Sequence, residues 1–232
     1  MFNTKFVEFL KTLNKVTNGI VLEYPVTSGK TDCSDIGFKF DISVFDDSGF
    51  EGKIGFVDLS SFLNIFNLFD KPEVQFKDGV ISAKDGNASV KYITSAIDLI
   101  SQFTFPVEQF SKTNDIPSVV EFTLSATDIK KLKASASTFK DANAVVFKGS
   151  ESLEIALTQV GKFNPSANCF KITKDITSNK NFEVSVSLET FSKIPVIDYT
   201  VKVKYNESKD AYRLLFVSND IIGFEMCVST NV

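Results

Sequence analysis

The sequence of 232 residues contains no His and no Trp, a single Arg and three Cys. Without His, a Ser–His–Asp triad, a His metal ligand and a His general base are all excluded. The three cysteines, Cys33, Cys169 and Cys227, lie far apart and form no C-x-x-C motif. This odd, scattered set argues against a disulfide framework and for a reducing compartment.

Long apolar runs are also missing. No run approaches the roughly 18–20 residues that span a bilayer. Lys5, Glu8, Lys11 and Lys15 interrupt the N-terminal segment where a signal peptide would have its apolar region. We therefore expect a soluble, cytoplasmic protein.

Residues that could carry catalysis or bind a metal do not gather in the sequence. Asp46 and Asp47 stand together before Ser48-Gly49, but no third ligand lies nearby, and adjacent Asp residues before Gly are typical of a turn. No pairing of a nucleophile with a base is recognisable either. We expect no metal, no cofactor and no enzymatic activity.

What the sequence does contain is a repeat, seen first in the stretch from Gly55 to Ile93. A short helix is predicted here, with Asp58 at its N-cap and Pro72 preventing its continuation. A three-stranded antiparallel meander follows, with Asp78-Gly79 and Asp85-Gly86-Asn87 as its turns. The predicted strands are Glu73–Phe76, Val80–Lys84 and Ser89–Ile93.

The same order returns later in the chain. A short helix within Ser187–Val196 precedes predicted strands at Tyr199–Tyr205, Ala211–Val217 and Gly223–Ser229. Upstream, an amphipathic helix over 2–16 and a strand at Ile20–Tyr24 match a helix over 125–140 and a strand at Ala144–Lys148. The chain therefore reads as two copies of one fold, offset by roughly 125 residues.

The remaining segments are assigned by alternation and by turn residues. The further predicted strands are Gly37–Phe45, Phe50–Val57, Val119–Leu124, Ser152–Gln159, Asn168–Thr173 and Phe182–Leu188. Loops are predicted at Thr27–Asp35 and Thr173–Asn181. Thr94–Ser118 shows no regular hydrophobic period and is predicted to connect the two halves. Either Ser125 or Thr127 caps the helix over 125–140, where Asp128 suits the positive helix end.

The net charge of −4 by itself argues against nucleic-acid binding. The distribution of the charges along the chain is more informative about partners. On the two long predicted helices, Lys11 and Lys15, and likewise Lys130 and Lys131, lie away from the apolar face. All basic residues except Arg213 are Lys, which lacks the bidentate fork that reads guanine edges. Any contact with DNA is therefore expected to be with phosphates and independent of base sequence.

In the order helix, strands, GFVDLSSFLNIFNLF and then EVQFKDGVISAKDGNASVKYI, the chain resembles a known family. This family is the sliding clamps, or DNA polymerase processivity factors, of T-even-type tailed phages, distant relatives of proliferating cell nuclear antigen. The resemblance is best over about Asn18–Ile100, stays in register through Val120–Leu157 and is thin in the last third. No short catalytic motif anchors it.

The resemblance implies an α+β DNA-clamp fold. Two topologically similar domains, at 1–105 and 119–232, would each have antiparallel sheets on the outside and two helices on the inner face, with an interdomain connector at 106–118. It further implies a homotrimeric ring that encircles duplex DNA and tethers the replicative DNA polymerase. A clamp loader and, in this family, the transcription machinery are further expected partners.

The resemblance also implies site residues. Lysines would line the DNA passage: Lys5, Lys11, Lys15, Lys130, Lys131, Lys133, Lys140 and Lys193. The second helix departs from this pattern, because its polar face carries only Ser60, Asn64 and Asn67.

Two further surfaces follow from the same resemblance. Subunits would join edge to edge through Lys91, Tyr92 and Ile93 of one copy and Cys169, Phe170 and Lys171 of the next, with Tyr92 buried at the seam. Partner peptides would dock near Phe105, Ile116, Pro117 and Val228.

Other readings of the residues remain open. A phage structural or adaptor protein could use the same β-rich repeat without binding DNA. A carboxylate-dependent hydrolase is disfavoured by the missing catalytic pairs. A single-strand binder is disfavoured because the aromatic residues fall mostly on alternating core positions, not on a Lys-bearing platform.

Overall fold

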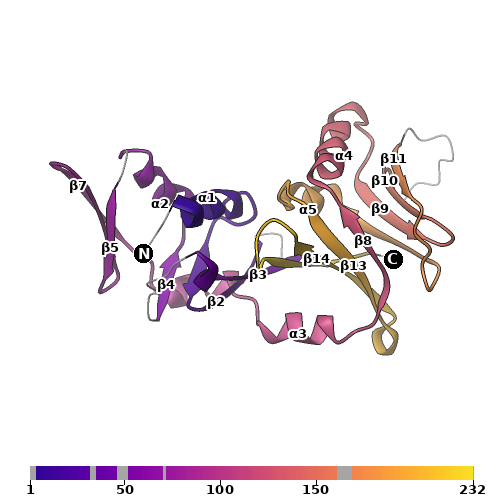
Figure 1. Cartoon of the computed structure of the whole chain (residues 1–232), viewed down its shortest axis with the longest axis horizontal. Coiled ribbons are helices and arrows are strands. Elements are labelled where there is room, and N and C mark those ends of the chain that lie inside the picture. Colours follow the sequence, from indigo (N-terminus) through magenta and orange to yellow (C-terminus); the bar gives the residue numbers. More distant parts are fainter. Residues whose placement is uncertain (1–3, 32–34, 46–51, 70–71, 161–168, 232) are drawn as a thin grey trace. The chain divides into compact units, whose positions relative to one another are not determined.

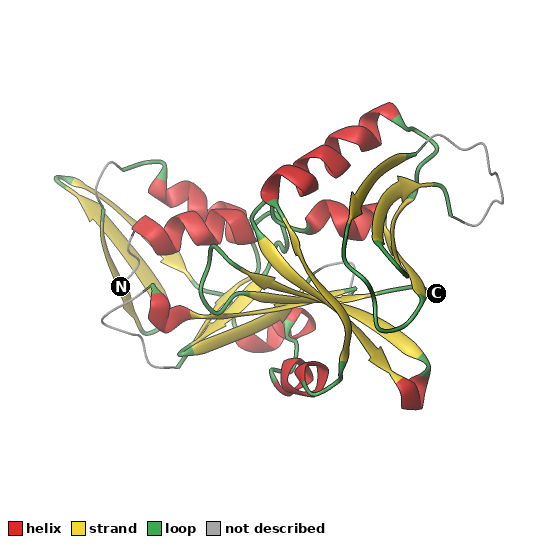
Figure 2. Cartoon of the chain, turned by 45° about the vertical axis from the view of Figure 1, so that its right-hand side comes forward, coloured by secondary structure: helices red, strands yellow, loops and turns green. Residues whose placement is uncertain are grey.

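The computed structural model describes residues 4–31, 35–45, 52–69, 72–160 and 169–231. The chain divides into two compact units, Met1–Val107 and Glu108–Val232. Strands dominate in both (Figure 2). Because each unit has its own core, each is described by itself.

Among its described residues, the first unit has two α-helices that contact each other, two antiparallel strand pairs and a three-stranded antiparallel meander (Figure 1). Strand β1 pairs with β4, β2 pairs with β3, and β5, β6 and β7 form a meander. The elements are α1 (Thr4–Leu13), β1 (Ile20–Glu23), β2 (Val26–Lys30), β3 (Ile36–Asp41), the 3-10 helix η1 (Ile42–Val44), β4 (Lys53–Phe56), α2 (Leu59–Phe66), β5 (Glu73–Lys77), β6 (Val80–Asp85), β7 (Ala88–Ile93) and the 3-10 helix η2 (Ile97–Phe103).

The core of the first unit is built largely from Phe. On α1, Phe6, Phe9, Leu10 and Leu13 are buried, as the helical spacing predicted. The Phe9 ring meets the Phe40 ring of β3 edge to face, at 4.7 Å between centroids. Aromatic pairs of this kind add about 0.5–1.5 kcal/mol beyond their buried area.

The second unit has two antiparallel sheets and three α-helices among its described residues. One sheet has the order β11-β10-β9-β12, and β8, β13, β14 and β15 pair in the order β8-β13-β14-β15. The elements are α3 (Glu108–Asn114), β8 (Ser118–Leu124), α4 (Ala126–Thr138), β9 (Ala144–Gly149), β10 (Leu153–Thr158), β11 (Phe170–Lys174), β12 (Phe182–Ser187), α5 (Leu188–Lys193), β13 (Tyr199–Asn206), the 3-10 helix η3 (Glu207–Lys209), β14 (Ala211–Ser218) and β15 (Glu225–Ser229).

Helices cover both sides of the strands in the second unit. Helices α4 and α5 contact β9, β10, β11 and β12, while α3 lies on the other side of β8, β13 and β14 (Figure 1). Period-2 alternation separates the two faces of the β13–β14 pair. Val201, Val203 and Phe216 are buried on one face, and Lys202, Lys204 and Arg213 lie on the face that meets α3.

The predicted repeat order is present in both units. Helix α2 is followed by the β5-β6-β7 meander, and α5 is followed by the β13-β14-β15 meander. A helix followed by a strand opens the repeat as well, as α1–β1 in the first unit and α4–β9 in the second. The α+β class with antiparallel sheets, predicted from the sequence, is confirmed.

Three segments differ from the predictions. The predicted loop Thr27–Asp35 is wrong in its first part, because β2 pairs with β3 there and buries Thr27 and Gly29. Gly29 and Lys30 have low strand propensity, so the partner strand determines the structure there. The strand predicted over Gly37–Phe45 ends at Asp41, whose carboxylate accepts a hydrogen bond from the Ser43 amide and starts η1.

The third difference lies in Thr94–Ser118, where no helix was predicted. This segment contains η2 and α3, and α3 folds within the second unit by burying Phe110 and Thr113. The turn predicted at Asp46–Gly49 lies outside the described residues. Within the described ranges, no helix has the length and apolarity to cross a membrane.

A close approach of two strands generates a stability prediction. Gly149 of β9 stands directly opposite Phe182 of β12, and the Phe182 ring occupies the space where a Cβ atom would be. Gly149→Ala should therefore lower the free energy of unfolding by about 1–3 kcal/mol through overpacking. Denaturant unfolding measures this, with Ser150→Ala at the exposed neighbour as a control; equal stability of the two variants would contradict the close packing.

Candidate nucleic-acid interface

Helix α4 presents two lysines to solvent. Its apolar face buries Ile129 and Leu132, and the intervening Lys130 and Lys131 are exposed. Among the described residues, neither lysine has a carboxylate within 4.0 Å. Both ammonium groups are thus available to an anionic ligand.

The N-terminal end of α4 is held by several hydrogen bonds. The Ser125 hydroxyl accepts from the Asp128 amide at 3.1 Å, and the Asp128 carboxylate accepts from the Ser125 amide at 3.3 Å, which is a capping box. Of the two predicted caps, Ser125 is therefore the correct one. The Ala126 amide also donates to Asp198 at 2.6 Å, a contact that the sequence did not predict.

An ion pair joins α4 to the sheet beneath it. Lys174 of β11 lies 3.1 Å from Asp128, and both side chains are mostly buried. Burial by itself raises the pKa of Asp128, but the hydrogen bonds from Lys174 and Ser125 and the charge of Lys174 outweigh burial and lower this pKa. The helix that carries Lys130 and Lys131 is therefore fixed by charges at its first turn.

Lys133 has a different role from its neighbours. Its ammonium group donates to the carbonyl oxygens of Ser192 (2.7 Å) and Ile194 at the C-terminal end of α5. Cations are favourable at that negative helix end. Because its ammonium group joins α4 to α5, we remove Lys133 from the predicted DNA lining.

The other lysines of the predicted lining differ in availability. Lys140 is exposed and Lys193 is half-buried. In the first unit Lys5 and Lys15 are exposed, whereas Lys11 pairs with Glu8 of the same helix at 2.7 Å. Exposed pairs of this kind contribute about 0.2–0.5 kcal/mol and exchange readily for another anion.

Helix α2 carries polar groups where the other helices carry charge. Asp58 caps it, as predicted, by accepting from the Ser61 amide at 3.0 Å. The hydrogen bond from the Ser61 hydroxyl is the main reason why the pKa of Asp58 is lowered. Ser60, Asn64 and Asn67 are exposed, so this helix offers hydrogen bonds but no positive charge.

Both strands of the predicted seam are edge strands within their units. Strand β7 ends the β5-β6-β7 sheet, and β11 ends the β11-β10-β9-β12 sheet. Ile93 at the end of β7 is 79% exposed, and Lys91 beside it is exposed too. Cys169 and Lys171 at β11 are exposed, with Phe170 half-buried.

Tyr92 packs within its own unit. Its ring lies 5.5 Å from Phe62 of α2 and 6.1 Å from Phe56 of β4 between centroids. Burial is the main reason why its pKa is raised, followed by the charge of Asp58. A substitution at Tyr92 would therefore disturb the first unit itself, and a test of the seam needs another residue.

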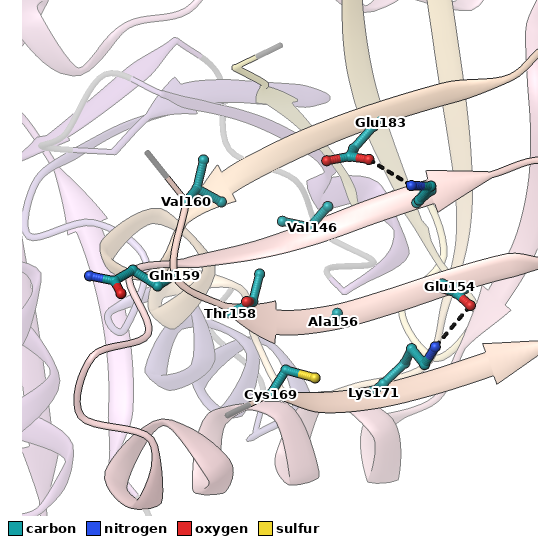
Figure 3. A pocket seen from close by; sticks show the side chains of 10 residues that line it. Val146, Glu154, Ala156, Thr158, Gln159, Val160, Cys169, Lys171 and Glu183 are labelled. Carbon is teal, nitrogen blue, oxygen red and sulfur yellow. Dashed lines mark hydrogen bonds and ion pairs between the residues drawn. The ribbon is translucent and has the colours of Figure 1, made fainter. Parts of the chain in front are cut away.

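The solvent face of the four-stranded sheet holds a depression of about 480 Å³ (Figure 3). Val146, Ala156 and Thr158 lie on its floor, and Cys169 and Lys171 lie towards the β11 edge. Its cations are already paired across strands, Lys171 with Glu154 at 2.9 Å and Lys148 with Glu183 at 3.0 Å. No set of three potential metal ligands occurs here or elsewhere in the described part of the chain.

The residues predicted to bind partner peptides are not equally accessible. Val228 is 0% exposed, because it lies on the core face of β15 opposite Leu214; its assignment was wrong. Phe105 is half-buried, and its ring lies where a Cβ atom on Gly37 would be, at 2.7 Å. Ile116 is half-buried and Pro117 exposed.

Comparison with solved structures places this geometry in a known architecture. The chain is similar to proliferating cell nuclear antigen from Entamoeba histolytica, with a TM-score of 0.68, 13% identity and coverage of 98% of this chain and 95% of that one. It is similar to the A. fulgidus protein solved with the C-terminal region of FEN-1 bound, with a TM-score of 0.66, 16% identity and coverage of 97% and 96%.

A subunit of a DNA polymerase gives the same result. The DNA polymerase III subunit beta from Pseudomonas aeruginosa has a TM-score of 0.62 and 13% identity, and 97% of this chain spans 62% of that one. No protein-family model and no curated protein matches the sequence. The chain therefore has the sliding-clamp fold. The DNA-clamp fold that the sequence predicted is confirmed.

The capping box of α4 yields a pH-dependent prediction. Because the pKa of Asp128 is lower in the folded than in the unfolded chain, its stabilising contribution is complete above about pH 5 and is lost as the pH falls through the folded-state pKa. Asp128→Asn should cost about 1 kcal/mol of unfolding free energy at pH 7.

The measurement is denaturant unfolding from pH 7 to pH 3. The difference between Asp128→Asn and the unsubstituted chain should narrow below about pH 5. Asp141→Asn, at an exposed residue beyond α4, is the control and should stay within about 0.5 kcal/mol. A difference that stays constant down to pH 3 would refute the role given to the carboxylate.

Proposed function

We propose that this chain is a sliding clamp, a ring of three copies that encircles duplex DNA and tethers a replicative DNA polymerase. The observation that carries the proposal is the clamp fold over 98% of the chain. The exposed, unpaired Lys130 and Lys131 on a firmly capped helix support it. In a chain of net charge −4, this pair is the proposed contact surface for phosphates.

The proposed contact with DNA is electrostatic. Lysines neutralise phosphates and release the counterions around the duplex, which binds DNA without reading its sequence. Each exposed contact is worth about 0–1 kcal/mol by analogy with surface ion pairs. Many weak contacts, repeated by the symmetry of a ring, retain the duplex while no base register is preferred, and the ring slides.

The proposed action is tethering, not catalysis. A polymerase that is bound to a ring around its template stays at high effective concentration near the primer end after each dissociation. The two units, Met1–Val107 and Glu108–Val232, are the proposed clamp domains. Ring assembly around closed DNA calls for a clamp loader, which we propose as a second partner.

Protein partners are proposed to dock through short peptides. The A. fulgidus clamp was solved with the C-terminal region of FEN-1 and a Helicobacter pylori clamp with a DNA ligase peptide. In this chain we retain Ile116, Pro117 and Phe105 as candidate contacts and discard the buried Val228. The resemblance to T-even-type phage clamps further suggests the transcription machinery as a partner, and the cytoplasm of the host cell as the location.

The subunits are proposed to join through β7 and β11. Each is an edge strand, and an edge strand carries unpaired backbone groups that another strand can satisfy. Pairing β7 of one copy with β11 of the next would remove both edges and cover Ile93. Three such joints close the ring.

Charge reversal on α4 tests the DNA contact. Lys130→Glu with Lys131→Glu should abolish retention on circular duplex DNA, while leaving the melting temperature unchanged because both residues are exposed. Lys77→Glu with Lys84→Glu, an equal charge change on the exposed face of β5 and β6, is the matched control and should retain DNA.

Retention is measured at several salt concentrations, since the affinity should fall steeply with salt. Equal loss of retention in both double variants would reject the assignment of the lining. A trimer that shows no salt-dependent retention at all would favour the structural or adaptor protein.

A substitution at the edge strand tests the ring. Ile93→Asp would place a charge in the proposed joint, where an unpaired buried charge costs several kcal/mol. The mass in solution should fall from about three times 25.7 kDa towards 25.7 kDa. Ile222→Asp, at an isoleucine that is 73% exposed in the second unit, should leave the mass unchanged; an intact trimer in Ile93→Asp would disprove the joint.

A further inference from the structure

A second positively charged site lies between α3 and the β13–β14 pair. It is a pocket of about 200 Å³, and four of its lining residues are cations, namely Lys112, Lys204, Lys209 and Arg213. No acidic residue is among the residues that line it. This composition is unusual in a chain that carries more acidic than basic residues.

The strand register places two of these cations side by side. Lys204 of β13 and Arg213 of β14 stand directly opposite each other in the antiparallel ladder, so that their side chains share one face. Like charges at such positions destabilise a sheet. An anion between them would turn this repulsion into attraction.

Lys204 is the most constrained of the four. It is 5% exposed, and its ammonium group donates to the carbonyl oxygens of Asn114 (3.2 Å) and Ile116 (2.8 Å) at the C-terminal end of α3. Burial, followed by the charge of Lys202, lowers its pKa. The charges of Glu121 and Asp115 oppose this lowering. Among the described residues, however, neither carboxylate lies within 4.0 Å of the Lys204 ammonium group, which carbonyl oxygens hold directly.

The other strand lysines of the second unit are compensated differently. Each of the four has a carboxylate partner within 4.0 Å. These pairs are Lys148–Glu183, Lys171–Glu154, Lys174–Asp128 and Lys202–Glu121. Among the described residues Lys204 lacks such a partner, and so do Lys112 on α3 and Lys209 on η3, both of which are exposed.

We propose that this pocket binds an oxyanion, a carboxylate or a phosphate group, between Lys112, Lys204, Lys209 and Arg213. The planar fork of Arg213 suits either group in a bidentate contact. A volume of about 200 Å³ admits one such group but lies below the roughly 300–1,000 Å³ of sites that enclose drug-sized ligands. The ligand is thus a small ion or a single acidic group of a larger partner.

This site is distinct from the proposed DNA surface. Helix α3 lies on the side of β8, β13 and β14 that faces away from α4 (Figure 1). A duplex bound to Lys130 and Lys131 therefore does not supply the anion. Binding of an anion in this pocket therefore does not depend on assembly of a ring.

A single NMR signal can report on the pocket. Arg213 is the only Arg in the chain, so its side-chain Nε–Hε resonance needs no separation from others. The full-length protein is titrated with inorganic phosphate and, separately, with N-acetylglutamate, against sodium chloride at equal ionic strength. We expect a saturable shift of the Arg213 signal with phosphate, with N-acetylglutamate or with both, and none with chloride.

Matched double variants locate the binding. Lys112→Gln with Lys209→Gln removes two exposed cations from the pocket and should weaken binding about tenfold or more, since charge-assisted hydrogen bonds contribute about 1.5–3 kcal/mol each. Lys77→Gln with Lys84→Gln removes two exposed cations from β5 and β6 of the first unit and should leave the affinity within about twofold. Melting curves check that both variants fold.

The outcomes separate the two sources. Saturation by phosphate alone identifies a free phosphate or phosphate-bearing ligand, and saturation by N-acetylglutamate alone identifies an acidic side chain of a protein partner. A shift that only drifts linearly with both probes, or equal weakening in the two double variants, would overturn the proposal.

Discussion

The hydrogen bonds and the ion pair at the first turn of α4 fix the position of this helix in the second unit. Four groups from three parts of the chain meet there: Ser125 and Asp128 at the start of the helix, Lys174 on β11 and Asp198 before β13. The first amides of a helix have no hydrogen-bond partners within the helix. Ser125 and Asp198 accept hydrogen bonds from two of these amides and so fix the residue at which α4 begins. These contacts hold α4 in position by its N-terminal end. Lys130 and Lys131 on its exposed face therefore do not contribute to its packing.

Local rules predicted much of this from the sequence. The caps at Asp58 and Ser125, the apolar face of α1 and the turns of the β5-β6-β7 meander each depend on neighbours in the chain, and all are present. The repeat of helix and meander extended these local predictions to the fold. Where local propensity is weak, as in β2, or where a helix is as short as α3, the partner decides the structure and the prediction failed.

The roles of individual lysines could be predicted least well. Lys130, Lys131 and Lys133 are close in sequence and look alike, yet Lys133 is bound to the end of α5, some sixty residues away. Whether an ammonium group is free depends on carbonyl and carboxylate groups that folding brings to it. One signal was available: Lys204 and Arg213 lie at equal distances from the β13–β14 turn, so a simple hairpin register already places them opposite each other.

The packing of Tyr92 on Phe56 and Phe62 means that β7 is anchored from within its own unit. A strand that pairs with it meets a surface that is ordered in advance, and the entropy lost on association is smaller than for a segment that must first fold. Because β7 is held in place in this way, its outer backbone groups stay available for pairing in a chain without a partner. Lys91 places a charge on this exposed edge, and charges at exposed edges hinder indiscriminate strand addition. Assembly through this edge would thus be quick to re-form after dissociation and selective against the wrong strand.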